Sequence, residues 1–113
     1  MAQNNFLALS PPYAVEEAIQ NLGQNLRTAR IRRNITIAEA AERIGTGVRA
    51  VRDAEHGKTT ASIAAYFALM WLYGLLPDSG SLADPDTDTE GKRLAESHSP
   101  KRASSGRRMD NEF

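Results

Sequence analysis

The chain has 113 residues, no cysteine and a net charge of zero, which comes from 14 basic and 14 acidic side chains. A chain of this length accommodates one small domain with flexible ends and leaves no room for a second, catalytic domain, so we predict that it is not an enzyme. The lack of cysteine excludes disulfides and thiolate metal sites, no cofactor is expected, and the lack of an apolar leader segment favours a cytoplasmic protein.

Residues 1–14 contain Asn-Asn and Ser-Pro-Pro and are predicted to form a flexible arm. A second interpretation stays open, in which the apolar side chains of this arm dock on the domain or on a partner. These side chains are Phe6, Leu7, Leu9 and Tyr13.

A helix is predicted from Val15 or Glu16 to Arg33, and Asn34 would help to end it. Apolar residues that recur at helical spacing define its buried face. They are Ile19, Leu22, Leu26 and Ala29.

Two short helices follow, joined by a turn at Gly45 to Gly47. Thr36 and Glu39 have the spacing of a capping box, which begins the first of these helices. Its predicted buried stripe is Ala38, Ala41 and Ile44. Thr46 is a candidate N-cap for the second helix, Val48 to His56, which would bury Val51 and Ala54 and end at Gly57. Val48, Arg49, Arg52 and Asp53 are then left on its free face.

Ser62 is a plausible N-cap for an apolar helix over Ile63 to Leu76, a run that is shorter than the roughly 20 residues needed to span a bilayer. This helix is apolar on nearly every side, so it either packs wholly within the core or presents one side to a second copy of the chain. We favour the dimer. The candidate interface residues are Tyr66, Met70, Trp71, Tyr73, Leu75 and Leu76.

Beyond this helix, at most one more short helix could form near Ser79 to Ala83. Residues 84–113 are polar, charged and rich in serine, so they are predicted to be disordered because they cannot bury enough apolar surface. The predicted fold is therefore an all-α, compact four- to five-helix bundle with a helix-turn-helix over residues 15–83, preceded by a flexible arm and followed by a disordered tail.

The zero net charge divides unevenly along the chain. Residues 1–76 hold eight basic and six acidic side chains, residues 77–90 hold five acidic and none basic, and residues 91–113 hold six basic and three acidic. Binding to nucleic acid depends on the local field, and four basic side chains lie in or near the paired helices. They are Arg43, Arg49, Arg52 and Lys58.

The segment TIAEAAERIGTGVRAVRDAEHG (residues 36–57), with LGQNLRTARIRRNI before it and an apolar helix after it, resembles the phage-repressor and Cro-like class of helix-turn-helix proteins, often called the xenobiotic-response-element family. The resemblance covers about Leu22 to Leu75. It implies that the second helix enters the major groove of double-stranded DNA and that Val48, Arg49 and Asp53 read bases.

The same resemblance implies that Arg30 and Glu55 form a structural ion pair, and it supplies candidates for contacts with the DNA backbone. These candidates are Thr36, Thr46, Arg52, Lys58 and Thr59. Ile37 and Gly47 depart from the glutamine and serine that the family often has at these positions, so some phosphate contacts could be lost. His56 and His98 have no accompanying ligand cluster, and no metal site is expected.

The apolar WLYGLL sequence and the tail LADPDTDTEGKRL also resemble the small regulators of Hip-type toxin-antitoxin modules. This second resemblance implies a homodimer that represses its own operon at a pseudo-palindromic operator and binds a kinase-like toxin. Two alternatives stay open: a stand-alone phage-type repressor, and an interaction or inhibitor protein that keeps the fold but binds DNA weakly.

Overall fold

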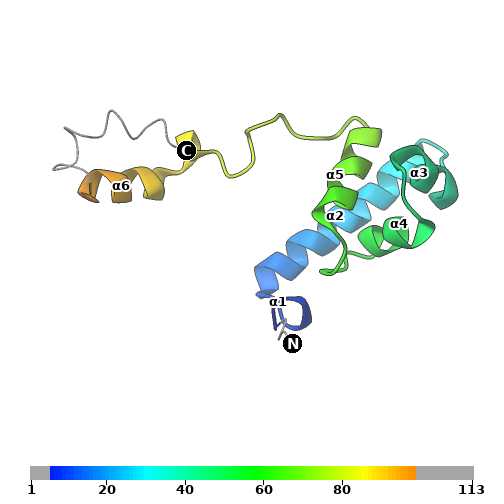
Figure 1. Ribbon diagram of the computed structural model, residues 1–113, viewed down its shortest axis with the longest axis horizontal. Helices are drawn as coiled ribbons and strands as arrows, with labels where there is room; N and C mark the ends of the chain where they lie inside the picture. The colour runs from blue at the N-terminus through cyan, green and yellow to red at the C-terminus, as the bar shows by residue number, and fades with distance from the viewer. Residues whose placement is uncertain (1–5, 99–113) are drawn as a thin grey trace. The chain divides into compact units, whose positions relative to one another are not determined.

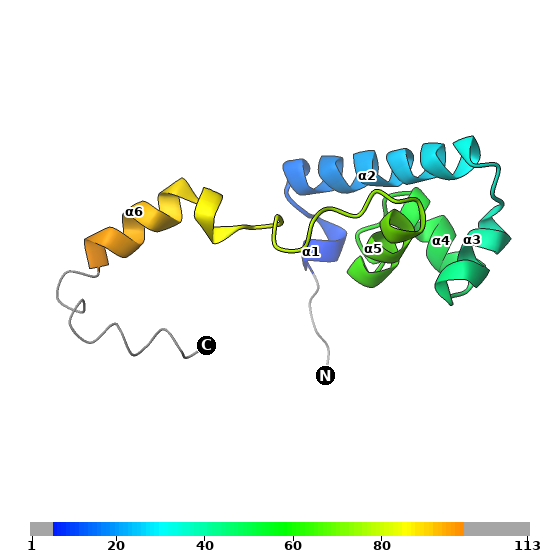
Figure 2. The same ribbon diagram turned by 90° about the horizontal axis from the view of Figure 1, so that it is seen from above.

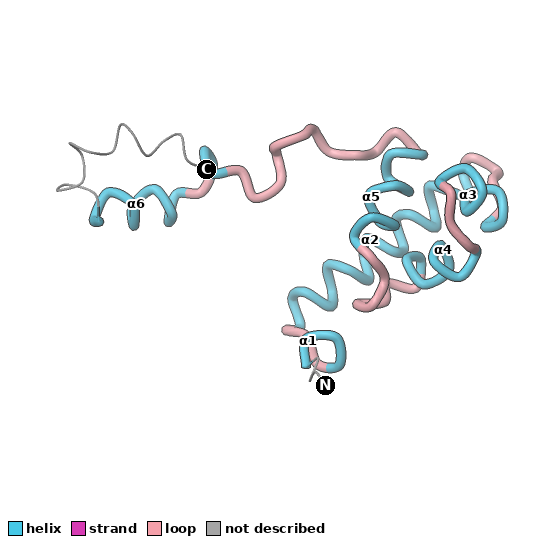
Figure 3. Tube along the Cα trace, in the orientation of Figure 1, coloured by secondary structure: helices cyan, strands magenta, loops and turns pink. Residues whose placement is uncertain are grey.

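The computed structural model describes residues 6–98, in which the regular elements are all helical (Figures 1 and 3). The chain divides into two units, residues 1–76 and 77–113. The first contains α1 (Phe6–Leu9), α2 (Tyr13–Arg32), α3 (Ile37–Ile44), α4 (Val48–Glu55) and α5 (Ile63–Leu72); the second contains η1 (Pro85–Thr87) and α6 (Thr89–His98). The predicted all-α class is confirmed.

Helix α2 forms one side of the first unit, and α3, α4 and α5 lie along one of its flanks (Figure 2). Leu26 and Ala29 are buried and Ile19 and Leu22 pack against the core, so the predicted buried face is confirmed. The helix begins at Tyr13 rather than Val15, because the carbonyl of Pro12 already accepts hydrogen bonds from the amides of residues 15 and 16. Asn34 has a φ of +57° and ends the helix, as expected.

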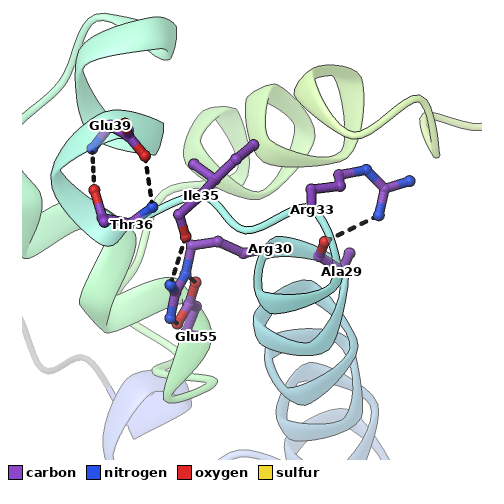
Figure 4. Close-up of polar contacts among 7 residues, drawn as sticks. All are labelled: Ala29, Arg30, Arg33, Ile35, Thr36, Glu39 and Glu55. Atoms are coloured by element: carbon purple, nitrogen blue, oxygen red, sulfur yellow. Dashed lines mark hydrogen bonds and ion pairs between the residues drawn. The ribbon is translucent and has the colours of Figure 1, made fainter.

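The capping box at the start of α3 is present: the Glu39 amide donates to Thr36 Oγ1 at 3.0 Å, and the Thr36 amide donates to Glu39 Oε1 at 2.9 Å (Figure 4). The predicted buried stripe is wrong at Ala38, which is exposed. A spacing of three residues drifts by about 60° at each step around a helix of 3.6 residues per turn, so that stripe cannot face one neighbour throughout. The inward face combines spacings of three and four: Ile37, Ala40, Ala41 and Ile44.

The N-cap of α4 is Gly47, and the prediction that Thr46 caps this helix is wrong. The reason lies in the short turn, where Gly45 ends α3 in the left-handed region and the Thr46 amide donates back to the Ala41 carbonyl at 2.9 Å. Thr46 therefore belongs to the end of α3. At the other end of α4, Gly57 has a φ of +66° and ends the helix, as expected. The Lys58 amide donates to the Asp53 carbonyl at 3.1 Å, which completes a Schellman motif.

Helix α5 begins as predicted, with the Ser62 hydroxyl accepting a hydrogen bond from the Ala65 amide, but it ends at Leu72. It packs against α2, α3 and α4, so its apolar side chains point into the domain over a wide arc. Tyr66, Met70 and Tyr73 are buried in the core. Their prediction as dimer-interface residues is wrong, whereas Trp71, Leu75 and Leu76 are exposed.

Arg33 joins the ends of α2 and α5. Its guanidinium donates to the carbonyls of Ala29 and Tyr73, each at 2.9 Å, and lies 5.5 Å from the centre of the Tyr73 ring. A cation placed at helix C-termini interacts favourably with the exposed carbonyls. Arg33 therefore fixes the point at which the chain leaves α5.

Two buried tyrosines, Tyr66 on α5 and Tyr73 at its C-cap, differ in hydrogen bonding. The Tyr66 hydroxyl donates to the Lys58 carbonyl at 2.9 Å, whereas the buried Tyr73 hydroxyl finds no hydrogen-bond partner within residues 6–98. Burial raises the pKa of both phenols above the usual 10.0, with a further contribution from Asp53 at Tyr66 and from Glu55 at Tyr73. The folded state therefore keeps these protons at a pH where the unfolded chain releases them, and stability falls as the pH rises above 10.

We expect Tyr66→Phe to lower the free energy of unfolding by about 1 kcal/mol, because it removes a hydrogen bond and leaves the Lys58 carbonyl without that donor. Tyr73→Phe should leave the free energy of unfolding unchanged or raise it by up to about 1 kcal/mol, because an unpaired buried hydroxyl is costly. Urea unfolding at pH 7 and above pH 10 measures both effects. Tyr73→Phe should also reduce the fall in the free energy of unfolding that occurs as the pH rises above 10. If the two variants lowered the free energy of unfolding equally at pH 7, the hydrogen-bonding difference between Tyr66 and Tyr73 would be contradicted.

The described part of the second unit, residues 77–98, holds two short elements that bury no side chain. Asp84 caps η1 by accepting from the Asp86 amide, Asp88 accepts from the Gly91 amide, and Glu90 pairs with Arg93 one turn later on α6. The predicted disorder is wrong for residues 85–87 and 89–98, because local caps and ion pairs can form a helix without tertiary burial. The remainder of that predicted tail, residues 99–113, lies outside the described residues.

The short helix predicted near Ser79 to Ala83 is not formed. These residues make turns, in which the Ser81 amide donates to the Asp78 carbonyl and Ala83 has a φ of +54°. A left-handed residue inside such a short segment prevents a helix from continuing.

Candidate nucleic-acid interface

Helices α3 and α4 are joined by only three residues, 45–47, and pack against one another. Each is eight residues long. Val51 and Ala54 of α4 are fully buried, which fixes the face that α4 turns to the core. This geometry is that of a helix-turn-helix, with α4 in the position of the helix that enters the major groove.

The outward face of α4 has the predicted composition. Val48, Arg49 and Arg52 are exposed, and the Arg49 side chain is 86% exposed. An arginine at such a position can donate two hydrogen bonds to guanine, and a valine can pack on a thymine methyl group. The chemistry needed to contact both bases and phosphates is therefore present on one helix face.

Asp53 lies between two cations at the end of this face. Its carboxylate is 4.0 Å from Arg49 Nε and 3.6 Å from Lys58 Nζ. The Asp53 side chain is only 25% exposed, against 52% for Lys58. The contact with Lys58 crosses the turn at Gly57 and was not predicted from the sequence.

The ion pair between Arg30 and Glu55 is present and buried (Figure 4). Arg30 Nε and Nη2 donate to the two Glu55 carboxylate oxygens at 2.6 and 3.0 Å, and Arg30 Nη1 donates to the Ile35 carbonyl at 2.9 Å. The hydrogen bond with Glu55 raises the pKa of Arg30, against the opposing effect of burial. This pair fastens α4 to α2 and to the segment that leads into α3.

The predicted contacts with the DNA backbone do not all remain available. Thr46 and Lys58 are exposed, and Thr36 is exposed although its hydroxyl already accepts from Glu39. Thr59 is partly buried, and its hydroxyl donates to the Ala8 carbonyl at 3.0 Å. Thr59 therefore holds the end of α1 against the loop after α4, which favours the docked interpretation of the N-terminal arm over the flexible one for residues 6–9.

Gly23 is a structural residue that the sequence pattern did not indicate. A Cβ at this position would lie 2.5 Å from the Ala54 carbonyl oxygen and 2.8 Å from the Gly57 nitrogen. Helix α2 therefore approaches the backbone at the end of α4 more closely than any side chain permits. The approach depends on residues about thirty positions apart, so no local signal could have revealed it.

Within residues 6–98, no group of three or more His, Asp or Glu side chains could hold a metal ion. In the same part of the chain, no helix is long and apolar enough to cross a membrane.

The fold and the exposed face of α4 define the class of helix-turn-helix proteins. A family model described as a helix-turn-helix domain matches residues 21–79, and the chain belongs to this family. No curated protein and no solved structure gives a significant match. Membership supports DNA as the partner of this domain, in a family that is typically not enzymatic.

Proposed function

We propose that the protein is a sequence-specific DNA-binding transcriptional repressor that acts in the cytoplasm as a homodimer. The observation that carries this proposal is the exposed set Val48, Arg49 and Arg52 on a helix that a buried ion pair holds in place. A rigid helix with free basic and apolar side chains is suited to reading base edges, because the side chains keep a fixed register on the duplex.

The residues divide by role. Val48, Arg49 and Asp53 read bases, and Arg52 and Lys58 contact phosphates on either side. Thr36 and Thr46 contribute further backbone contacts from the start of α3 and the turn. Thr59 is left out of this set, because its hydroxyl is engaged by Ala8.

The homodimer brings two copies of α4 to one pseudo-palindromic operator, with half-sites about one DNA turn, roughly 34 Å, apart. Three exposed apolar residues at the end of α5 and just after it support this proposal: Trp71, Leu75 and Leu76, which are 62%, 51% and 43% exposed. No charged side chain occurs between Ile63 and Leu76. A two-fold interface here would therefore place no like charges opposite one another.

We expect Arg49→Ala to weaken binding to the specific site by about 1 to 3 kcal/mol while leaving binding to random DNA much less affected. Lys58→Ala, in contrast, should weaken binding to all sequences and lower the salt dependence by about one unit. Fluorescence anisotropy over a range of salt concentrations, with labelled specific and scrambled duplexes, separates the two effects. Equal losses for Arg49→Ala on both duplexes would show that Arg49 reads no base.

A second candidate is the antitoxin of a kinase-type toxin-antitoxin operon, a role that includes repression of its own operon. The exposure of Trp71 within the WLYGLL sequence favours it, because that sequence is part of the resemblance to such regulators. Co-purification with a co-expressed kinase-like protein, lost in Trp71→Ser but not in Arg49→Ala, would support this role. A repressor that acts alone would bind DNA only, and an interaction protein with weak DNA binding would retain only the protein partner.

A further inference from the structure

The ionic contacts of Asp53 are loose. At 4.0 Å from Arg49 Nε and 3.6 Å from Lys58 Nζ, its carboxylate is beyond hydrogen-bond distance of both cations. Surface ion pairs of this kind contribute little to stability and are screened by salt. The arrangement therefore contributes little to stability. Its charges nevertheless act on any ligand that approaches α4.

Asp53 is more buried than the two cations beside it. Its carboxylate lies on the last turn of α4 and is 25% exposed, whereas Arg49 and Lys58 extend long side chains into solvent. The Lys58 amide bonds to the Asp53 carbonyl, and the Lys58 carbonyl accepts from the buried Tyr66, so the backbone on both sides of this contact is fixed. A partly buried negative charge thus lies beside more exposed positive charges.

This placement has opposite consequences for two kinds of DNA. Phosphates that approach α4 at random meet a carboxylate which repels them and which already pairs with the two nearest cations. A duplex that places a cytosine amino group at the carboxylate supplies it with a donor and releases Arg49 and Lys58 for guanine and phosphate. Specificity can be gained in this way by penalising the wrong partner.

We propose that Asp53 is a specificity-determining residue that suppresses binding to random DNA by pairing with Arg49 and Lys58 in the free protein. The inference rests on the proposed function and adds to it, because Asp53 acts against incorrect sequences as well as reading the correct one. One carboxylate thus pairs with two cations, one on α4 and one in the loop after it.

The test uses the full chain and two duplexes: a fixed duplex of random sequence, and a duplex selected by the wild-type protein from a randomised pool. Asp53→Asn should bind the random duplex about two- to fivefold more tightly, the size of an interaction between surface charges, and with a salt slope steeper by about one. The ratio of specific to random affinity should fall. Asp53→Glu keeps the charge and should retain most of that ratio.

Asp78→Asn is the matched control, since it changes the net charge equally at an exposed position outside the first unit. It should leave both affinities as they are in the wild type. If Asp53→Asn behaves like Asp78→Asn on the random duplex, the inference is overturned while the proposed function stands. If the wild type binds neither duplex at low salt, the proposed function and the inference both fail.

Discussion

Arg30→Met is expected to lower the free energy of unfolding by about 3 to 5 kcal/mol, because it leaves the buried Glu55 carboxylate without its cation. The Ile35 carbonyl also loses a donor, so the segment that leads into α3 should loosen. The double variant Arg30→Met/Glu55→Met should recover a large part of the loss, because no charge is then stranded in the core. Urea unfolding followed by circular dichroism measures the free energies of unfolding of the wild type and of both variants.

Arg32→Met is the matched control, since Arg32 is exposed on the same helix and forms no ion pair with another of residues 6–98. It should change the free energy of unfolding by less than about 0.5 kcal/mol. If Arg30→Met cost no more than Arg32→Met, the pair would not be what fastens α4 to α2.

Gly23→Ala should also lower the free energy of unfolding, in this case because the added methyl group overpacks the contact between α2 and α4. The new Cβ would lie 2.5 Å from the Ala54 carbonyl oxygen and 2.8 Å from the Glu55 carbonyl oxygen, and both atoms belong to backbone that cannot rotate away. Overpacking of this kind typically costs about 1 to 3 kcal/mol and sometimes more, which outweighs the roughly 1 kcal/mol gained from the helix propensity of alanine. Thermal unfolding should show a lower Tm, and DNA binding should weaken because α4 is displaced.

Gly47→Ala provides the comparison, because Gly47 has a φ of −85° and a Cβ there would meet nothing within 4 Å. Its effect should be below about 1 kcal/mol, in line with a modest change at an N-cap. A Gly23→Ala protein as stable as Gly47→Ala would show that α2 and α4 can separate without cost.

The features that were predicted correctly depend on residues close in sequence. The caps at Thr36 and Ser62 and the helix ends at Asn34 and Gly57 each involve groups within five positions of one another, so the sequence carries the whole signal. The exposed face of α4 followed from the burial of Val51 and Ala54 in the same way. The ion pair between Arg30 and Glu55 was anticipated only through the family resemblance.

The errors arose where a local pattern does not determine the neighbours of an element. Helix α5 is apolar on nearly every side, so its sequence could not show that Tyr66 and Tyr73 face the core while Trp71 faces solvent. Composition excluded a buried core after Asp84, yet α6 forms from local contacts alone. Gly23 lies against the end of α4, about thirty positions further along the chain, and periodicity does not report such a contact. The contact between Asp53 and Lys58 spans only five positions, but it joins two side chains across the turn at Gly57, where the helical periodicity of α4 ends.

Selection of duplexes from a randomised pool by the wild-type chain tests whether α4 reads a DNA sequence in a two-fold complex. The wild-type chain should enrich inverted half-sites centred about 10 base pairs apart, and Arg49→Ala should lose the enrichment at defined positions within each half-site. Sequences that remain random after selection at low salt would contradict sequence reading by α4, and the exposed residues around Trp71 would then be the surface to examine for a protein partner.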